Sequence, residues 1–469
     1  MSALWTWDDL VHAAGASADG APSVSLTGFS IDTRTLAPGD VFVALKDARD
    51  GHDFVSDAFA KGASAALVAT GYARKPGDGA LVRVDDPLAA LARMGAAARA
   101  RARARVVAVT GSAGKTGTKE MLRAALSSAG RVHASQRSYN NHWGVPLTLA
   151  LLPPDTDFAV FEIGMNHPGE ITPLSRLVRP EIAVITNVLP VHLGHFANEE
   201  AIADAKAEIF AGLRPGGTAI LNRDNRHFAQ LAAAARAAGA HICSFGTQDG
   251  ADVRAASMAP DGGGTTVTLD RPGRPVFRVG APGLHLAANA LAVAAVIDCL
   301  GLDLAATLAP LAGVTAPPGR GARSVIACAG GALLLVDESY NANPASMRAA
   351  LAGLATTPRA DFPRRIAVLG DMLELGPASA DLHRGLADAV ASAGIDLLFA
   401  CGPMMRGLFD TLPSGIRGAW RETSRDLAPE VAAAVRPGDA VMVKGSLGTN
   451  MAPVVAALKA LGGSGAAAG

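Results

Sequence analysis

A short turn with the sequence Thr110-Gly-Ser-Ala-Gly-Lys-Thr116 contains the residue types best suited to bind phosphate. Its glycines let the backbone approach an anion closely, and the N–H groups at the start of a following helix attract negative charge. Lys115 supplies a cation for β- and γ-phosphates, and the Thr116 hydroxyl supplies one ligand for Mg²⁺. The turn is therefore predicted to cradle a triphosphate with residues Gly111, Ser112, Ala113, Gly114, Lys115 and Thr116.

The residues on both sides of this turn fit a strand-turn-helix phosphate site. An apolar run at 106–109 precedes it, and apolar side chains recur with helical spacing over 118–126. The common phosphate-loop pattern has a glycine at position 109, where this chain has Val109, so the loop is a shortened form. An ordinary glycine turn between a strand and a helix is the alternative interpretation.

A carboxylate follows the next apolar run of the same region. Glu162 lies near the end of the strand-like run 158–164, between Phe161 and Ile163, which favours a buried position. Ligands of open α/β sheets bind at the carboxyl ends of the strands. We therefore expect Glu162 to face the phosphate turn and to reach the Mg²⁺.

Two further side chains extend this pattern. His192 follows the strand-like run 182–188, and its neutral imidazole is predicted to ligate a second metal ion, with His195 as the alternative. Lys206 lies near the buried face of a predicted helix over 202–210. Taken alone, it is a solvated or snorkelling lysine.

Charge and length restrict the class of protein. With 42 basic and 42 acidic residues the net charge is zero, which gives no electrostatic footprint for nucleic acid. A helicase or repair ATPase is therefore disfavoured. A chain of 469 residues is too long for one ordinary core, and about two to four domains are expected.

The cysteines and the apolar segments favour a cytoplasmic protein. The chain has four cysteines without a Cys-x-x-Cys pair, which suggests neither a zinc site nor a disulfide framework. Its N-terminus lacks the basic start and apolar core of a signal peptide. The apolar helical segment 286–302 is short for a bilayer span and is interrupted by Asn289 and Asp298. We expect a buried core helix there and no membrane insertion.

Strand-like runs alternate with alanine-rich helical stretches, which predicts an α/β fold with mostly parallel sheets. We expect one domain at 1–101, a second at 102–315, a third at 316–462 and a disordered tail at 463–469. A glycine-rich stretch at 261–269 predicts a hairpin. Because alternate residues of a helix point in different directions, Arg99, Arg101, Arg103 and Arg105 are interpreted as a solvated linker.

The order and spacing of several motifs resemble the Mur ligase family over essentially the whole chain. These motifs are Thr110–Thr116, Tyr139-Asn-Asn-His-Trp-Gly-Val-Pro146, Glu162-Ile-Gly-Met-Asn166, Asn187-Val-Leu-Pro-Val-His192, Lys206-Ala-Glu-Ile-Phe210 and Gly283-Leu-His-Leu-Ala-Ala-Asn289. Within the family, the strings at 337–347 and 368–376 are similar to those of the members that add D-alanyl-D-alanine.

The resemblance implies an α/β protein of three domains. They are a small uridine-nucleotide-binding domain, a central P-loop ATPase-like domain and a C-terminal Rossmann-like doubly wound domain. It also implies ATP-dependent joining of D-alanyl-D-alanine to UDP-N-acetylmuramoyl-tripeptide through an acyl phosphate, in peptidoglycan precursor synthesis. The expected partners are these small molecules, with no nucleic acid, and the chain is expected to be a cytoplasmic monomer.

The resemblance also implies roles for single residues. Lys115, His192 and Lys206 are the expected catalytic residues, with Lys206 carbamylated so that its anionic carbamate holds Mg²⁺. Of two Mg²⁺ ions, the first would bind Thr116 and Glu162 and the second His192. The remaining nucleotide contacts are assigned to Asn289, Arg320, Asp337 and Asn341, and the UDP-substrate contacts to Ser30, Thr33, Arg34, Lys46 and His52. Asn343 is a further candidate for the dipeptide or the ATP sugar, or for a turn.

Some positions depart from the family pattern. Ser138 and Leu286 stand where asparagine is common, Asp47 replaces a glycine, and Asn450 stands where a basic residue is common. None of them is a phosphate, metal or carbamate position. The alternatives are a sister ligase that adds one amino acid such as diaminopimelate, a nucleotide-binding scaffold without activity, and a small-molecule kinase. The string Ser339–Pro344 disfavours the first, the intact metal positions disfavour the second, and the third domain disfavours the last.

Overall fold

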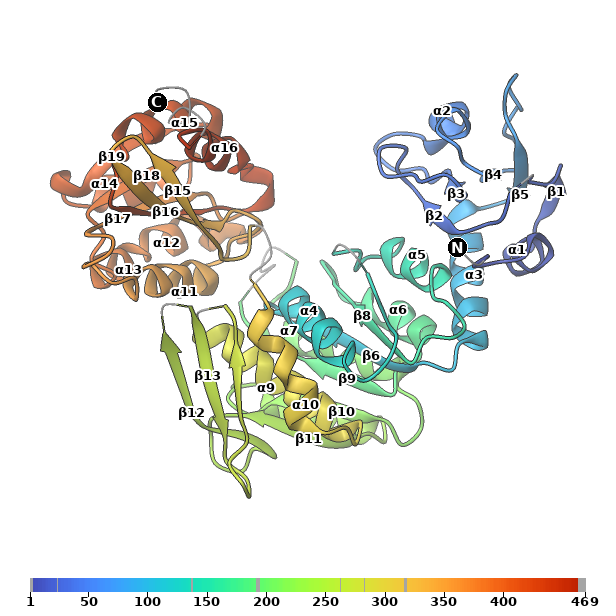
Figure 1. Ribbon diagram of the computed structural model, residues 1–469, viewed down its shortest axis with the longest axis horizontal. Coiled ribbons are helices and arrows are strands. Elements are labelled where there is room, and N and C mark those ends of the chain that lie inside the picture. Colours follow the sequence, from blue (N-terminus) through green and yellow to red (C-terminus); the bar gives the residue numbers. More distant parts are fainter. Residues whose placement is uncertain are drawn as a thin grey trace.

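Three β-sheets follow one another along the chain, and helices pack against each of them (Figure 1). The structure is a computed structural model that describes residues 3–22, 24–135, 138–190, 195–261, 263–281, 283–315 and 319–462. The predicted α/β class with mostly parallel sheets is confirmed. His192 and the predicted tail at 463–469 lie outside the described residues.

The N-terminal sheet has five strands in the order β1-β5-β4-β3-β2, and only the pairing of β1 with β5 is antiparallel. Its strands are β1 (Ser17–Asp19), β2 (Gly28–Ser30), β3 (Asp40–Val43), β4 (Ala65–Ala69) and β5 (Ala80–Val84). Its helices are α1 (Trp7–Ala14), the 3₁₀ turn η1 (Gly51–Phe54), α2 (Val55–Ala60) and α3 (Pro87–Arg101).

The central sheet has nine strands in the order β14-β13-β12-β11-β10-β9-β6-β8-β7. Its strands are β6 (Arg105–Thr110), β7 (Val132–Ala134), β8 (Phe158–Glu162), β9 (Ile182–Ile185), β10 (Thr218–Asn222), β11 (His241–Gly246), β12 (Val253–Asp261), β13 (Gly264–Leu269) and β14 (Val276–Val279). Its helical elements are α4 (Lys115–Leu126), α5 (Gly144–Ala150), α6 (Ile171–Val178), α7 (Glu199–Ala207), η2 (Glu208–Gly212), α8 (Phe228–Ala237), α9 (Leu284–Cys299), α10 (Leu304–Leu308) and η3 (Ala309–Gly313). The predicted hairpin is confirmed, because β12 and β13 pair antiparallel.

The C-terminal sheet has six strands in the order β15-β16-β20-β17-β18-β19, and only β15 runs antiparallel to its neighbour. Its strands are β15 (Ala322–Cys328), β16 (Gly331–Glu338), β17 (Arg364–Gly370), β18 (Leu397–Cys401), β19 (Arg417–Arg421) and β20 (Asp439–Lys444). Its helical elements are α11 (Pro344–Ala355), η4 (Gly376–Ala378), α12 (Ser379–Arg384), α13 (Ala387–Ser392), α14 (Met405–Thr411), η5 (Ser414–Ile416), α15 (Ser424–Ala434), η6 (Leu447–Thr449) and α16 (Ala452–Ala460).

The central sheet is buried on both faces because alternate residues of its strands enter different cores. Val106 and Ala108 of β6 belong to a core that continues into the N-terminal sheet. Val107 and Val109 belong to the core under α9. The predicted buried helix near 286–302 is confirmed, since α9 has a continuous buried run from Asn289 to Ile297. In the described part of the chain, no helix is both long and apolar enough to cross a membrane.

The N-terminal and central parts are joined by more than the chain connection. The Trp5 indole N–H donates to the carbonyl of Ala150 at 2.9 Å, and the Arg101 guanidinium lies 3.8 Å from the centre of the Trp5 ring. Arg101 also donates to the carbonyl of Leu4. The Trp5–Ala150 hydrogen bond therefore joins the two parts, and Arg101 holds Trp5 in place.

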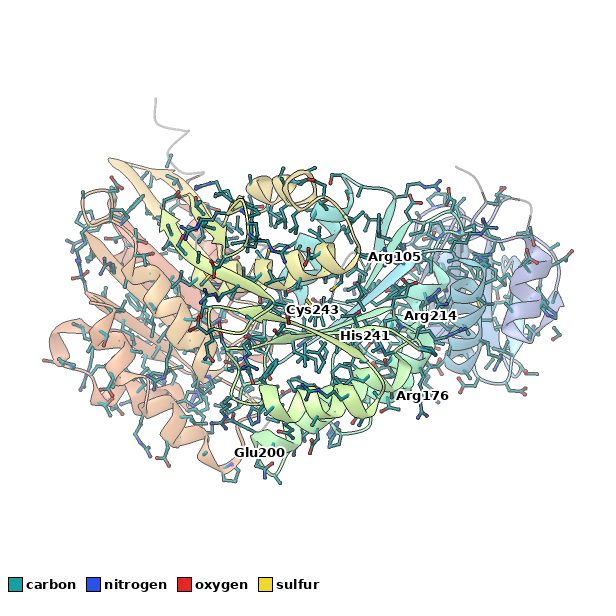
Figure 2. The ribbon with its side chains drawn as sticks, turned by 90° about the horizontal axis from the view of Figure 1, so that it is seen from below. Arg105, Arg176, Glu200, Arg214, His241 and Cys243 are labelled. Carbon is teal, nitrogen blue, oxygen red and sulfur yellow. The ribbon has the colours of Figure 1, made fainter. Side chains whose placement is uncertain are left out.

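The interpretation of the arginines at 99–105 as a solvated linker is wrong for Arg99, whereas Arg103 is exposed as expected. Arg99 is only 7% exposed, and its guanidinium donates to the carbonyls of Val178 and Arg179 at the end of α6. Arg105 lies at the start of β6 and, with Arg214, pairs with Glu181 on the side near the N-terminal part (Figure 2). The direction in which each side chain leaves the helix does not reveal such contacts, because the accepting carbonyls belong to residues about 80 positions away in the sequence.

Arg99→Met should lower the stability of the chain measurably. Methionine keeps the apolar stem but leaves two carbonyls without their donor, which costs about 1–3 kcal/mol. We expect a lower urea midpoint than that of the wild type, measured by far-ultraviolet circular dichroism. Arg103→Met, at an exposed position, is the matched control and should change stability by no more than about 0.5 kcal/mol. Equal midpoints for the two variants would contradict the role of Arg99.

Candidate functional site

The phosphate turn connects β6 to α4, as the sequence predicts, and its glycines are required by its backbone. Gly114 has a φ of 84°, and a Cβ atom there would lie 2.5 Å from Asn289 Oδ1 on α9. A Cβ atom on Gly111 would lie 1.9 Å from Thr186 Oγ1. Side chains at either position would therefore force α9 or the end of β9 away from the turn.

Neighbouring strand ends hold this turn in place. The Ala113 N–H donates to Asn187 Oδ1, and the Thr186 hydroxyl donates to the carbonyl of Ala113. The Ser112 hydroxyl donates to the carbonyl of Leu189 and accepts from its N–H. The turn is thus preorganised by the segment that follows β9.

The structure explains the absence of a glycine at position 109. Val109 is a fully buried residue of β6, and it pairs with Glu162 of β8 and Val184 of β9. The strand therefore continues to Thr110, and the turn begins at Gly111. The loop is shorter because position 109 holds a strand residue, Val109, where the common pattern has a loop glycine.

Lys115 begins α4 and points back toward the turn. Its ammonium donates to the carbonyl of Gly111 at 2.7 Å. Burial lowers the pKa of Lys115, the nearby Glu162 carboxylate raises it, and Arg320 lowers it again. The cation therefore lies among the backbone groups predicted to surround phosphate.

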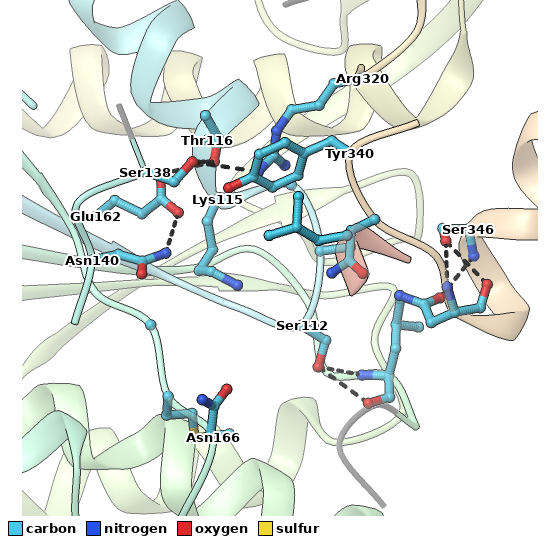
Figure 3. A pocket seen from close by; sticks show the side chains of 18 of the residues that line it. Ser112, Lys115, Thr116, Ser138, Asn140, Glu162, Asn166, Arg320, Tyr340 and Ser346 are labelled. Carbon is cyan, nitrogen blue, oxygen red and sulfur yellow. Dashed lines mark hydrogen bonds between the residues drawn. The ribbon is translucent and has the colours of Figure 1, made fainter. Parts of the chain in front are cut away.

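A group of polar side chains surrounds Glu162, which is buried with 2% exposure (Figure 3). Its Oε2 accepts from the Thr116 hydroxyl at 2.9 Å, and its Oε1 accepts from the Asn140 amide at 2.7 Å. The two predicted ligands of the first metal ion are thus adjacent. Both present hard oxygen atoms of the kind Mg²⁺ prefers.

A hydroxyl links this group to the segment that leads into the C-terminal sheet. Ser138 Oγ lies 3.3 Å from Thr116 Oγ1 and accepts from Arg320 Nη2 at 3.4 Å. The Arg320 guanidinium in turn lies 3.9 Å from the centre of the Tyr340 ring. Figure 3 shows this series of contacts from Glu162 to Tyr340.

Lys206 is buried with 2% exposure on α7, so it lies on the buried face as predicted and is not a solvated lysine. Burial lowers the pKa of Lys206 well below its ordinary value, and the charge of Lys115 lowers it further. Within the described ranges no carboxylate lies within ion-pair distance of its ammonium. The neutral amine is therefore favoured.

The C-terminal sheet presents its own polar residues at the ends of β16 and β20. Lys444 is 3% exposed, and its ammonium donates to Glu338 Oε2 at 3.3 Å and to the carbonyl of Asn341 at 2.9 Å. Asp337 is turned away, because its carboxylate accepts from the N–H and hydroxyl of Ser339. Asn343 caps α11 in a capping box with Ser346.

These groups line one cavity of about 1300 Å³ between the central and C-terminal sheets. The central part contributes the phosphate turn from Ser112 to Gly117, together with Glu162 and Asn289. The later part contributes Arg320, Glu338, Tyr340, Asn341, Lys444 and the loop residues 373–375 and 446–448. Neither Asp337 nor Lys206 is among the lining residues, and the His195 ring instead lies tilted against that of His167, with 4.4 Å between ring centres.

The residues predicted to contact the UDP substrate gather at the carboxyl edge of the N-terminal sheet. Ser30 ends β2, and its hydroxyl donates to the carbonyl of Asp32. Arg34 pairs with Asp32, and the Thr33 hydroxyl accepts from Lys61. The Arg34 side chain is 79% exposed and therefore accessible to a ligand.

Lys46 and His52 belong to the next loop of that edge. Lys46 is exposed and forms an isolated β-bridge with Asp50. His52 Nε2 accepts from the N–H of Ala69, so its Nδ1 carries the proton and donates to Asp50 at 2.6 Å. The imidazole therefore holds the loop to the end of β4.

Comparisons with known proteins agree with this geometry. The family models of the Mur ligase middle domain and of the Mur ligase glutamate ligase domain match residues 109–297 and 324–447. A UDP-N-acetylmuramoyl-tripeptide--D-alanyl-D-alanine ligase of Escherichia coli (strain K12) is 38% identical over 441 residues, 93% of this chain and 94% of its own. The chain belongs to the Mur ligase family.

Solved structures of Mur ligases share the whole fold. MurF from Acinetobacter baumannii superimposes with a TM-score of 0.83 and 31% identity, covering 97% of this chain and 99% of its own. MurF from Thermotoga maritima in complex with ADP gives a TM-score of 0.76 and 25% identity, over 94% and 98% of the two chains.

The structure adds residues of this Mur ligase that sequence reasoning missed. Asn140 lies in a quoted motif, but nothing in its local pattern indicates that its amide binds Glu162. Glu208 caps α6, where its carboxylate accepts from the N–H groups of Gly169, Ile171 and Thr172. The motif at 206–210 could have signalled Glu208, because a carboxylate stabilises the N-terminus of a helix.

Two departures from the Mur ligase pattern have a structural explanation. Ser138 takes part in the contacts between Thr116 and Arg320, so a hydroxyl replaces the more common amide. Asn450 has a φ of 50°, which asparagine tolerates better than most residues, and its carbonyl accepts from Ser424. It does not line the cavity.

Lys206→Met should stabilise this Mur ligase at neutral pH. Between the low pKa of folded Lys206 and its ordinary value of 10.5, the unfolded chain binds more protons, so wild-type stability rises with pH. Methionine removes the cost of burying the lysine amine, so the variant should be more stable than the wild type by about 1 kcal/mol or more at pH 7. The difference should shrink as the pH approaches 10.5.

Urea midpoints measured at several pH values, in CO₂-free buffer with a chelator, check this expectation. Lys459→Met, at an exposed position of α16, is the matched control and should show the same pH dependence as the wild type. A wild type more stable than Lys206→Met at pH 7 would contradict the penalty assigned to Lys206.

Proposed function

We propose that this Mur ligase joins D-alanyl-D-alanine to UDP-N-acetylmuramoyl-tripeptide, with conversion of ATP to ADP and phosphate. The observation that carries the proposal is the cavity in which the phosphate turn and Glu162 face the ends of β16 and β20. The reaction named for the Escherichia coli relative, which matches over 93% of this chain, supports the choice of substrates. The product belongs to peptidoglycan precursor synthesis.

The chemistry requires positive charge at one place. A carboxylate is a poor electrophile, so the tripeptide carboxylate first attacks the γ-phosphorus of ATP, and the bond to the bridging oxygen of ADP breaks. The dipeptide amine then attacks the acyl carbon, loses a proton, and the C–O bond to phosphate breaks. Lys115 and Arg320 lie where they can offset the charge of the two approaching anions.

The residues present fit Mg²⁺, which would neutralise phosphate charge when bound. Thr116 and Glu162 supply adjacent hard oxygen ligands for a first ion, and His192 is our proposed ligand of a second. We also propose that Lys206 is carbamylated: its amine adds to CO₂ and releases a proton, which gives an anionic oxygen ligand. The burial that favours the neutral amine of Lys206 supports this step.

The remaining assignments follow from position. Asn289 contacts the phosphate turn at Gly114, and Asn341 and Arg320 line the same cavity, which supports nucleotide contacts. Asp337 reaches the nucleotide in this proposal only if its bonds to Ser339 are rearranged. Ser30, Thr33, Arg34, Lys46 and His52 are proposed to recognise the uridine nucleotide, with His52 acting by positioning its loop.

We further propose that the ligase acts as a monomer in the cytoplasm on small-molecule substrates. We also propose domain boundaries at residues 101 and 315, because the described elements change from one sheet to the next after α3 and after η3.

The purified chain should release phosphate from ATP only when UDP-muramoyl-tripeptide and D-alanyl-D-alanine are both present. A phosphate-release assay with each substrate omitted in turn checks this dependence, and mass spectrometry of the product identifies the new amide. Equal or greater release with diaminopimelate and the dipeptide precursor would instead assign the chain to the sister ligases that add one amino acid.

Lys206→Ala should lose ligation by about two orders of magnitude or more, since it removes the group that holds a metal ion. Short carboxylic acids such as acetate should restore part of the activity, because their carboxylate can occupy the place of the carbamate. The rate of phosphate release with increasing acetate measures this rescue. Folded Lys206→Ala protein that acetate does not rescue would argue against carbamylation.

A further inference from the structure

Two leucines on the C-terminal side of the cavity are exposed, Leu373 in the loop after β17 and Leu447 at the start of η6. In the described part of the chain, the exposed large hydrophobic residues are Val24, Val276, Leu284, Val325, Leu373, Met404 and Leu447. Of these, Leu373 and Leu447 line the cavity, with 45% and 64% exposure. Single exposed leucines are ordinary on a surface, but two on adjoining loops of one cavity indicate an apolar ligand group.

The two leucines form one surface, which we call the leucine shelf. Leu373 follows β17 and Leu447 follows β20, and these strands are neighbours in the C-terminal sheet. Leu373 also approaches Gly448, where an added Cβ atom would lie 2.7 Å from Leu373 Cδ1. The shelf is therefore continuous from the loop after β17 to η6.

Hydrogen bonds between the two loops fix the shape of the shelf. The Leu373 N–H donates to Ser446 Oγ at 2.9 Å, and the Ser446 N–H donates to the carbonyl of Asp371 at 3.0 Å. The Asp371 carboxylate in turn accepts from the N–H groups of Met404 and Met405 at the start of α14. An apolar surface held this firmly can discriminate between ligands by shape.

The backbone also turns sharply after Leu373. Glu374 has a φ of 63°, a conformation that is uncommon for a residue with a side chain and that concentrates at functional sites. Leu375 beyond it is buried with 3% exposure. The turn thus leaves Leu373 exposed in the cavity while its neighbour enters the core.

The groups next to the shelf are polar and charged. Ser446 lies between Leu447 and the Lys444–Glu338 ion pair, whose Glu338 Oε1 has no donor among the described residues. An occupant of this corner of the cavity must therefore combine small apolar groups with a charged end. Of the three proposed substrates, D-alanyl-D-alanine matches that description, with two methyl groups beside an ammonium and a carboxylate.

We propose that the leucine shelf binds the methyl side chains of the acceptor dipeptide and thereby sets which acceptors the ligase uses. This inference rests on the proposed function and goes beyond it, because it assigns acceptor specificity to Leu373 and Leu447.

The test compares acceptors rather than overall rates. For the full chain, kcat/KM is measured by phosphate release with D-alanyl-D-alanine, with D-alanyl-glycine, which lacks one methyl group, and with D-alanyl-D-leucine. In Leu373→Ala and Leu447→Ala, the preference for D-alanyl-D-alanine over D-alanyl-glycine should fall about 3- to 10-fold, since each lost methyl contact is worth that much. D-alanyl-D-leucine should be used better than by the wild type.

Val325→Ala is the matched control, because Val325 of β15 is a similarly exposed apolar residue of the C-terminal sheet that does not line the cavity. Its preference should equal that of the wild type. Unchanged preferences in both leucine variants, or an equal loss with all three acceptors, would overturn the inference; an equal loss would instead indicate a surface used in domain closure. Failure of the wild type to release phosphate with any dipeptide would overturn the proposed function itself.

Discussion

The cost of burying amino groups beside a single carboxylate is the constraint on which this site depends. Burial lowers the pKa of both Lys115 and Lys206, the charge of Arg320 further lowers that of Lys115, and Glu162 is the buried carboxylate that raises it. Burying amino groups with so little compensation is unfavourable, and the arrangement suits a polyanionic ligand that supplies the missing negative charge. The same charges that destabilise the ligand-free chain are thus those that phosphoryl transfer requires.

The contacts around Glu162 explain how two sheets can serve one reaction. Glu162 and Thr116 belong to the central part, whereas Arg320 and Tyr340 belong to the segment that enters the C-terminal sheet. Ser138 lies between them and connects the Thr116 hydroxyl to the guanidinium. The N-terminal sheet is held differently, through Trp5 and Arg101 and a shared apolar core, which suits a platform that keeps a long substrate in register.

Local chemistry made several features predictable. Gly111, Gly114 and Lys115 are close in sequence, and their types indicate a phosphate turn without knowledge of the rest of the chain. Glu162 was predicted to be buried because its neighbours are apolar, and the structure places it 2.9 Å from Thr116. The interpretation of Arg99 failed because its partners are distant in sequence. The direction of a side chain on its own helix gives no information on the carbonyls of another helix.

The sequence by itself determined the α/β class, the phosphate turn, the buried α9 helix and the resemblance to the Mur ligases, because each depends on residue type and short-range spacing. Only the tertiary structure decided that Ser138 and Asn140 join the Glu162 group, that Asn343 caps a helix, and that Leu373 and Leu447 line the same cavity. These relations depend on which strand ends meet at one edge of a sheet and on how two sheets face each other. Contacts between residues far apart in the chain are set by packing, which residue spacing does not encode.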